Sequence, residues 1–319
     1  MSSANASPDP AHGPAHRPAF DLATADAPVP ADASKAAEEA AEEAKSHHIN
    51  TGRNLPAAIA VGVVLGGLAL LTLLTVKATF LIYMGAALLI ALHELDTAFR
   101  TKGIKIPTIP VVAGGTAMLL AAYWAAGGAV AAIFALTVLG VLIARMFSGT
   151  DGYVRDVTAG MFATAYLPLL GSTVAAMLAD HNGGKRVLIF IILAICSDIG
   201  GYFAGITLTP LTGGHKMAPV ISPKKTWEGL AGSVFLAVVA GGILVPALLH
   251  GHWWQGIVTG IAAVAAAVFG DLAESMIKRD LGIKDMGSLL PGHGGILDRI
   301  DSLLASAPVV WLLLALFVK

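Results

Sequence analysis

The chain has 319 residues, of which 56% are hydrophobic and 13% are charged, and its formal net charge is −1. Soluble proteins usually carry about 25% charged residues, so this composition excludes an ordinary soluble domain and predicts a polytopic membrane protein. The near-neutral charge also argues against a nucleic-acid partner, which would require a basic stripe. A single cysteine, Cys196, excludes a disulfide within the chain.

Residues 1–54 differ in composition from the rest of the chain. They are rich in alanine, proline and acidic residues, and prolines recur between Pro8 and Pro30. Such a sequence opposes regular structure and cannot bury a core. No apolar segment near the start suggests a cleaved secretory signal. We expect a disordered cytoplasmic tail at 1–54 and a transmembrane domain at 55–319.

About nine apolar segments follow the tail, each close to the roughly 20 residues that a helix needs to cross a bilayer. We therefore predict an all-α polytopic membrane protein with about nine transmembrane helices. The segments are 55–74, 79–95, 109–126, 129–146, 157–179, 187–207, 229–250, 255–272 and 302–318.

Lysines and arginines accumulate in alternate loops, and the positive-inside rule places those loops in the cytoplasm. With the N-terminus inside, nine crossings put the C-terminus outside. We expect a multi-pass protein of the cell (inner or plasma) membrane whose polar cavity faces the cytoplasm. The basic residues in the predicted inner loops are Arg100, Lys102, Lys105, Arg145, Arg155, Lys216, Lys224, Lys225 and those of 275–302, against Lys77, Lys185 and Arg186 outside.

Residues 275–302 are the most polar stretch of the apolar region. A dense cluster of mixed charge is costly near a bilayer, so it indicates a functional site. Cationic side chains suit phosphate, and carboxylates suit a hard divalent metal. The titratable residues of the cluster are Lys278, Arg279, Asp280, Lys284, Asp285, His293, Asp298, Arg299 and Asp301.

Just before and within this cluster, Asp271, Glu274, Ser275 and Lys278 have the spacing of one helix face. Two carboxylates beside a hydroxyl and a lysine can hold a metal ion and its phosphate ligand. The same residues can instead form an internal salt-bridged seam, and the sequence leaves both interpretations open.

A glycine-rich turn and an acidic pair complete the cluster. Glycines permit a close approach of backbone N–H groups to an anion, which we expect of Gly294 and Gly295. His293 is a phosphate donor, a metal ligand or a turn residue. Asp298 and Asp301 lie three residues apart and suit Mg²⁺, although Asp301 also suits a helix cap.

A second basic element precedes the seventh segment. Ser222 followed by Pro223 is typical of the start of a helix. Lys224 and Lys225 would then oppose the helix dipole unless an anion binds there. We expect a triphosphate or a lipid phosphate near these lysines and Thr226; the alternative is an ordinary positive-inside pair.

Two further groups of acidic residues lie within predicted spans. Asp198 in the sixth segment is a functional candidate because an intramembrane carboxylate is costly. His93, Glu94 and Asp96 end the second segment, where we expect them to be solvated at the membrane interface.

The cluster resembles the C-terminal signature of the CDP-diacylglycerol synthase family, also called phosphatidate cytidylyltransferases. The segment 222–229 (SPKKTWEG) and Asp198 are similar to two further family blocks, so the resemblance covers roughly 55–319. The residues that match the signature are Ser275, Lys278, Arg279, Lys284, Asp285, His293, Gly294, Gly295, Asp298, Arg299 and Asp301.

The resemblance implies a Mg²⁺-dependent reaction in which CTP and phosphatidate give CDP-diacylglycerol and pyrophosphate. It implies one or two divalent cations, with a monovalent cation as a further candidate, and a possible homodimer in the lipid bilayer. Rival interpretations are a CTP-dependent polyprenol-type lipid kinase and an ion-coupled transporter.

We assign roles, as hypotheses, to residues of the cluster and to the candidate residues outside it. The expected metal ligands are Asp271, Asp298 and Asp301, with Asp198 and Glu274 as further candidates. The expected catalytic residues are Lys278, Arg279, His293, Asp298, Arg299 and Asp301. The expected substrate-binding residues are Ser222, Lys224, Lys225, Thr226, Ser275, Lys284, Asp285, Gly294 and Gly295.

Overall fold

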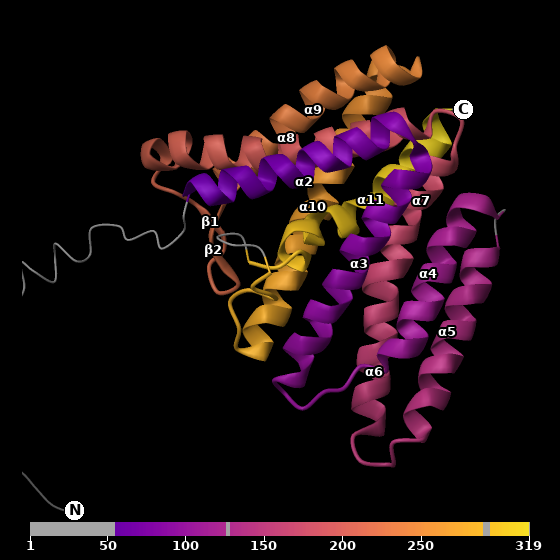
Figure 1. Cartoon of the computed structure of the whole chain (residues 1–319). Coiled ribbons are helices and arrows are strands. Elements are labelled where there is room, and N and C mark those ends of the chain that lie inside the picture. The colour runs from indigo at the N-terminus through magenta and orange to yellow at the C-terminus, as the bar shows by residue number, and fades with distance from the viewer. Residues whose placement is uncertain (1–54, 126–127, 290–293, 319) are drawn as a thin grey trace, which may run out of the picture. The chain divides into compact units, whose positions relative to one another are not determined.

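The computed structural model describes residues 55–125, 128–289 and 294–318. The tail predicted at 1–54 and the predicted site residue His293 lie outside these residues. The described part is almost entirely helical (Figure 1), as expected for apolar segments whose backbone groups need internal partners in a bilayer.

The elements follow one another with short connections. In chain order they are α2 (Leu55–Thr75), α3 (Lys77–Arg100), α4 (Thr108–Trp124), α5 (Ala129–Met146), α6 (Tyr153–Thr164), η1 (Ala165–Leu169), α7 (Leu170–Ala179), α8 (Gly183–Thr212), β1 (Lys216–Ala218), β2 (Ser222–Thr226), α9 (Trp227–Leu249), α10 (Trp253–Leu281) and α11 (Leu297–Phe317).

Among the described residues, seven helices are long and apolar enough to cross a membrane, and α6, η1 and α7 together count as one of them. The described apolar helices at Gly62–Thr75 and Thr108–Trp124 are shorter. Each of the nine predicted segments overlaps one of these helices. The predicted helical membrane fold is therefore confirmed, whereas the number of crossings stays a prediction. The fifth segment is interrupted at η1, a π-helical turn that contains Pro168, because proline lacks the N–H of a regular helix.

The segment between α8 and α9 corrects one prediction. Ser222 does not begin a helix, because residues Ser222–Thr226 form β2, which pairs antiparallel with β1. The helix begins at Trp227, and Thr226 is its N-cap: its Oγ1 accepts a hydrogen bond of 3.1 Å from the N–H of Gly229. Threonine is an adequate cap, and this register keeps both lysines out of the first turn, where they would oppose the dipole.

The last two helices extend further into the polar cluster than the apolar segments predicted. Helix α10 continues past 272 to Leu281, where Gly282 ends it with a φ of 72°. Helix α11 begins at Leu297, five residues before the predicted 302. A segment predicted from hydropathy stops where charged residues begin. The helix itself can continue beyond that point when its charged residues lie on a face inside the protein. Asp271, Glu274, Asp298 and Asp301 consequently lie on helices, whereas Asp285 lies in the loop between them.

Small residues allow α8, α9 and α10 to approach closely. A Cβ atom on Gly200 of α8 would lie 2.3 Å from the carbonyl oxygen of Gly232 of α9. One on Gly256 of α10 would lie 1.9 Å from the carbonyl oxygen of Gly241. Helices in lipid associate mainly through such close packing. Helix α11 also packs against α10 and α3.

Candidate active site

A cavity of about 470 Å³ lies among α8, β2, α9, α10 and α11. It brings together residues from segments that lie far apart in the sequence. Its charged lining residues are supplied by α8, by the paired lysines of β2, by the end of α10 and by the start of α11. They are Asp198, Lys224, Lys225, Asp271, Asp298, Arg299 and Asp301, and the predicted hydroxyl residues Ser222 and Thr226 line the same cavity.

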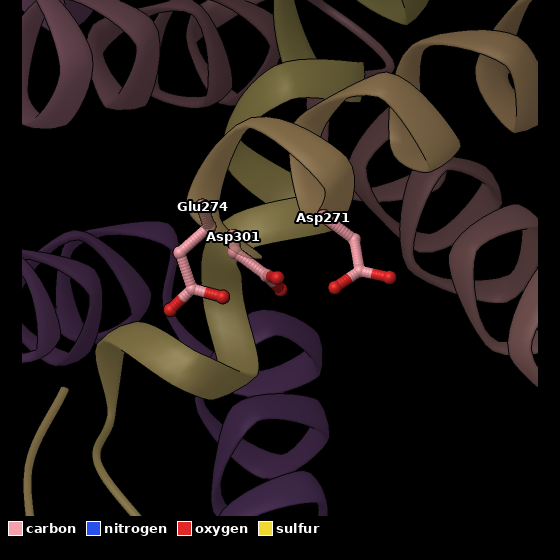
Figure 2. A group of neighbouring side chains, drawn as sticks. All are labelled: Asp271, Glu274 and Asp301. Carbon is pink, nitrogen blue, oxygen red and sulfur yellow. The ribbon is translucent and has the colours of Figure 1, made fainter. Parts of the chain in front are cut away.

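Three carboxylates from α10 and α11 form the acidic group of this site. One oxygen from each of Asp271, Glu274 and Asp301 lies within 4.8 Å of the others. Figure 2 shows the carboxylate of Asp301 between the other two. Glu274 and Asp301 are 0% and 5% exposed. Buried carboxylates this close together repel one another unless a cation or a proton compensates their charge.

The group fits a hard divalent cation. Oε1 of Glu274 is buried and has no hydrogen-bond partner among the described residues, which is costly for a buried acceptor. That oxygen could coordinate a cation, and Mg²⁺ prefers sites in which all the ligands are oxygen atoms. Glu274, Asp271 and Asp301 are therefore the residues that could hold a metal ion here.

Lys278 connects the acidic group to the loop that follows α10. Its Nζ donates hydrogen bonds to Oε2 of Glu274 at 2.6 Å and to Oδ1 of Asp298 at 2.9 Å. Its side chain is 14% exposed, and both carboxylates are buried. In this arrangement Lys278 positions two carboxylates and compensates part of their charge.

Asp298 is held by the loop as well as by Lys278. Its Oδ2 accepts hydrogen bonds of 2.9 Å from the N–H groups of Met286 and Gly295. The expectation that the Gly295 N–H faces a substrate anion is therefore wrong in this structure, because the turn folds back onto the first turn of α11. Gly294 adopts a positive φ of 81°, which glycine permits.

The β-hairpin is tied to the acidic group by an ion pair. Nζ of Lys225 contacts Oδ2 of Asp271, and it also donates a 3.4 Å hydrogen bond to the carbonyl oxygen of Val268. The side chain of Lys225 is 22% exposed. The basic and acidic elements predicted separately from the sequence thus meet directly.

The expectation for Glu94 was wrong, because it is 5% exposed rather than solvated. Its Oε1 accepts a 3.0 Å hydrogen bond from the N–H of Ile296, and its Oε2 accepts a 2.9 Å hydrogen bond from the N–H of Leu297. These N–H groups belong to the start of α11, so the glutamate of α3 caps the helix that carries Asp301.

Two glycines allow the loop to pack against this cap. A Cβ atom on Gly287 would lie 2.4 Å from Oε1 of Glu94, and one on Gly295 would lie 2.5 Å from its Oε2. Asp96, on the same helix, is also buried, and its Oδ1 accepts a hydrogen bond from the N–H of Ile106. His93 is exposed, as expected.

Comparison with known proteins identifies the family. The model of the cytidylyltransferase family matches residues 56–317. The chain belongs to the cytidylyltransferase family. Proteins named phosphatidate cytidylyltransferase from Mycobacterium leprae and Mycobacterium tuberculosis are 39% and 38% identical to it, over 83% of this chain and 89% and 84% of their own lengths. One from Brucella suis is 40% identical over 50% of this chain and 57% of its own length.

Family membership confirms the resemblance seen in the sequence, but not every signature residue lies in the cavity of this cytidylyltransferase. Arg279, Lys284 and Asp285 are exposed, and Ser275 is half-buried. In the part of the chain that the structure describes, none of these four lines the cavity. Their catalytic and substrate-binding roles stay predictions, as does that of His293, which lies outside the described residues.

Proposed function

We propose that this chain is a phosphatidate cytidylyltransferase, which transfers the cytidylyl group of CTP to phosphatidate. The observation that carries the proposal is one cavity of a membrane protein that is lined by Lys224, Lys225 and Arg299 together with Asp271 and Asp301, two of the three grouped carboxylates. The relatives that cover most of the chain carry this name. Neither the kinase nor the transporter interpretation is favoured by any observation.

The reaction requires positioning more than acid–base chemistry. A phosphate oxygen of phosphatidate attacks the α-phosphorus of CTP, and the bond from that phosphorus to the bridging oxygen of the β-phosphate breaks. CDP-diacylglycerol and pyrophosphate are the products. Because the attacking oxygen is already anionic, no strong base is needed, and the residues around the cavity act by orienting the reactants and compensating phosphoryl charge.

In this proposal Asp271, Glu274 and Asp301 hold Mg²⁺. The support is their 4.8 Å grouping and the unpartnered oxygen of Glu274. When bound, the ion compensates the charge on the phosphoryl oxygens. Asp198 lines the same cavity and remains a candidate ligand. Asp298 instead anchors the loop through Lys278, Met286 and Gly295, so its role as a ligand stays a prediction, as do a second cation and a monovalent cation.

The basic side chains of the cavity compensate the charge of the substrates. Lys224, Lys225 and Arg299 line it from two sides and suit the triphosphate and the lipid phosphate. Thr226 also lines the cavity; its hydroxyl accepts the hydrogen bond that caps α9 and lies 3.5 Å from the hydroxyl of Thr209. Ser222 lines the same wall.

We propose the predicted topology, with nine crossings, the N-terminus and the cavity on the cytoplasmic side of the cell membrane, and the C-terminus outside. Lys224, Lys225 and Arg299, which line the cavity, belong to the more basic set of connections, which the positive-inside rule places in the cytoplasm. The opposite ends carry Lys77, Lys185 and Arg186. A homodimer stays a prediction.

Labelled CTP tests the function. The purified protein is incubated with phosphatidate, Mg²⁺ and CTP that carries ³²P at either the α- or the γ-position. A cytidylyltransferase transfers only the α-label to the lipid and releases γ-label as pyrophosphate. Transfer of the γ-label to the lipid, with release of CDP, would identify a kinase and reject the proposal.

A further inference from the structure

A second cavity, of about 260 Å³, lies among α2, α3, α7, α8 and α11. Its lining is almost wholly apolar, and includes Leu65, Ala69 and Leu303. The hydroxyl of Tyr83 in this wall is already satisfied, because it donates a 3.2 Å hydrogen bond to the carbonyl oxygen of Leu65. Among the described residues, Arg299 is the one residue that lines both this cavity and the catalytic cavity.

The first turns of α11 separate the two cavities. Asp298, Asp301 and Ser302 line the catalytic cavity, and their spacing places them on one side of the helix. Ile300 and Leu303 line the apolar cavity on another side. Arg299 lies at the boundary between these two sides. A molecule that occupies both cavities would therefore cross from polar to apolar surroundings beside a guanidinium group.

We propose that the apolar cavity receives one acyl chain of phosphatidate, and that Arg299 contacts the phosphate of the same lipid. This inference rests on the proposed function, which supplies a single molecule with an anionic phosphate and apolar chains. Arginine binds phosphate well because its planar donors match the oxygens. The phosphate of phosphatidate must lie in the catalytic cavity to react, whereas its acyl chains must lie in apolar surroundings outside that cavity.

The size and position of the cavity favour one chain. Its volume of about 260 Å³ is slightly below the roughly 300–1,000 Å³ of pockets that enclose drug-sized ligands, so the second chain stays in the bilayer. A third cavity, of about 380 Å³ among α3, α4 and Pro168, is also apolar. None of its described lining residues lines the catalytic cavity, so the same argument does not apply to it.

Cross-linking to the unaltered protein tests the position of the chain. The probe is phosphatidate with a diazirine in the middle of one acyl chain, and photolysis is followed by peptide mapping. We expect adducts on the elements that line the apolar cavity, α2, α3, α7, α8 or α11, that excess dioleoyl phosphatidate suppresses. Adducts confined to α4 or α9, or adducts that the competitor does not suppress, would overturn the inference.

A filled cavity tests the consequence for kinetics. Ala69→Phe places a large side chain in the lining from α2, whereas Leu70→Phe alters an adjacent exposed residue that is 40% exposed. We expect Ala69→Phe to raise KM for dioleoyl phosphatidate about tenfold, with unchanged KM for CTP and for water-soluble dihexanoyl phosphatidate. Leu70→Phe should leave all three unchanged.

The two proposals fail differently in these experiments. An equal effect of Ala69→Phe on the long and short lipids, or no effect on either, would overturn the acyl-chain site while CDP-lipid synthesis persists. Absence of CDP-lipid from the unaltered protein with every lipid would instead reject the proposed function. The cross-linking result stands even where the Ala69→Phe variant does not fold.

Discussion

Glu94 accepts a hydrogen bond from the backbone N–H of Leu297, 203 residues further along the chain. The contact joins α3, in the first half of the chain, to the first residue of the helix that carries Asp301. Because the neighbouring N–H of Ile296 donates to the other oxygen of the same carboxylate, both oxygens are engaged. The orientation of the acidic group therefore depends on a residue that does not line the catalytic cavity.

We predict that Glu94→Gln lowers activity by about 10–100-fold, the usual effect of losing a residue that orients metal ligands. A glutamine amide presents one acceptor and one donor, so one of the two N–H groups loses its partner. The Mg²⁺ concentration for half-maximal activity should rise, because Glu94 no longer fixes the start of α11 and therefore the position of Asp301. A Mg²⁺ titration of CDP-lipid formation measures this.

His93→Gln is the matched control for that prediction, since His93 is the exposed neighbour of Glu94 on the same helix. It should behave as the unaltered protein. A Glu94→Gln variant with a normal Mg²⁺ titration would show that the cap does not position the acidic group.

Neutralising the acidic group should remove the cation and the activity together. We expect Asp301→Asn and Asp271→Asn each to lower the turnover number by at least about 100-fold, as for loss of a group that stabilises transition-state charge. Electron paramagnetic resonance of added Mn²⁺ measures binding without turnover. Asp280→Asn, an exposed change on the same helix α10, is the charge-matched control, and normal Mn²⁺ binding by Asp301→Asn would contradict the assignment.

Lys225→Met should weaken the use of CTP. The ammonium contacts Asp271 and lines the cavity, and a hydrogen bond to a charged group contributes about 1.5–3 kcal/mol. We therefore expect kcat/KM for CTP to fall roughly tenfold or more. Lys216→Met, an exposed lysine of the same hairpin, should have no effect. Equal kinetics of the two variants would remove Lys225 from the proposed site.

Packing between α9 and α10 gives a prediction about stability. Gly256→Leu inserts a side chain where even a Cβ would lie 1.9 Å from the carbonyl oxygen of Gly241. Overpacking usually costs about 1–3 kcal/mol, so Tm in detergent micelles should fall. Gly67→Leu, on α2 where nothing lies within 4 Å of an added Cβ, should leave Tm unchanged. An unaltered Tm in Gly256→Leu would show that the close packing of α9 against α10 at this position does not contribute to stability.

The sequence predicted those features that local spacing determines. Asp271 and Glu274 lie three residues apart, so one helical turn is enough to place them together. The apolar runs likewise located the helices, although not their ends, because hydropathy does not distinguish a polar helix face from a loop. Residues Ser222–Thr226 were assigned to a helix because Ser-Pro suits both a helix start and a strand edge.

Glu94 was missed for a different reason. Its partners are backbone N–H groups, which carry no sequence signature, and they lie about 200 residues away. The available signal was an acidic residue close to the end of an apolar segment, which interfacial solvation explains equally well. Long-range capping of this kind requires the fold.

The Lys225–Asp271 contact would make the proposed binding of a metal ion and the proposed binding of CTP interdependent. If Asp271 coordinates a cation, that ion competes with the ammonium for the same carboxylate, and the lysine becomes available to an incoming triphosphate. By reciprocity, a nucleotide that draws the lysine away strengthens the hold of the carboxylate on the ion. The enzyme would thus take up metal and nucleotide cooperatively, through an exchange of partners that needs no movement larger than one side chain.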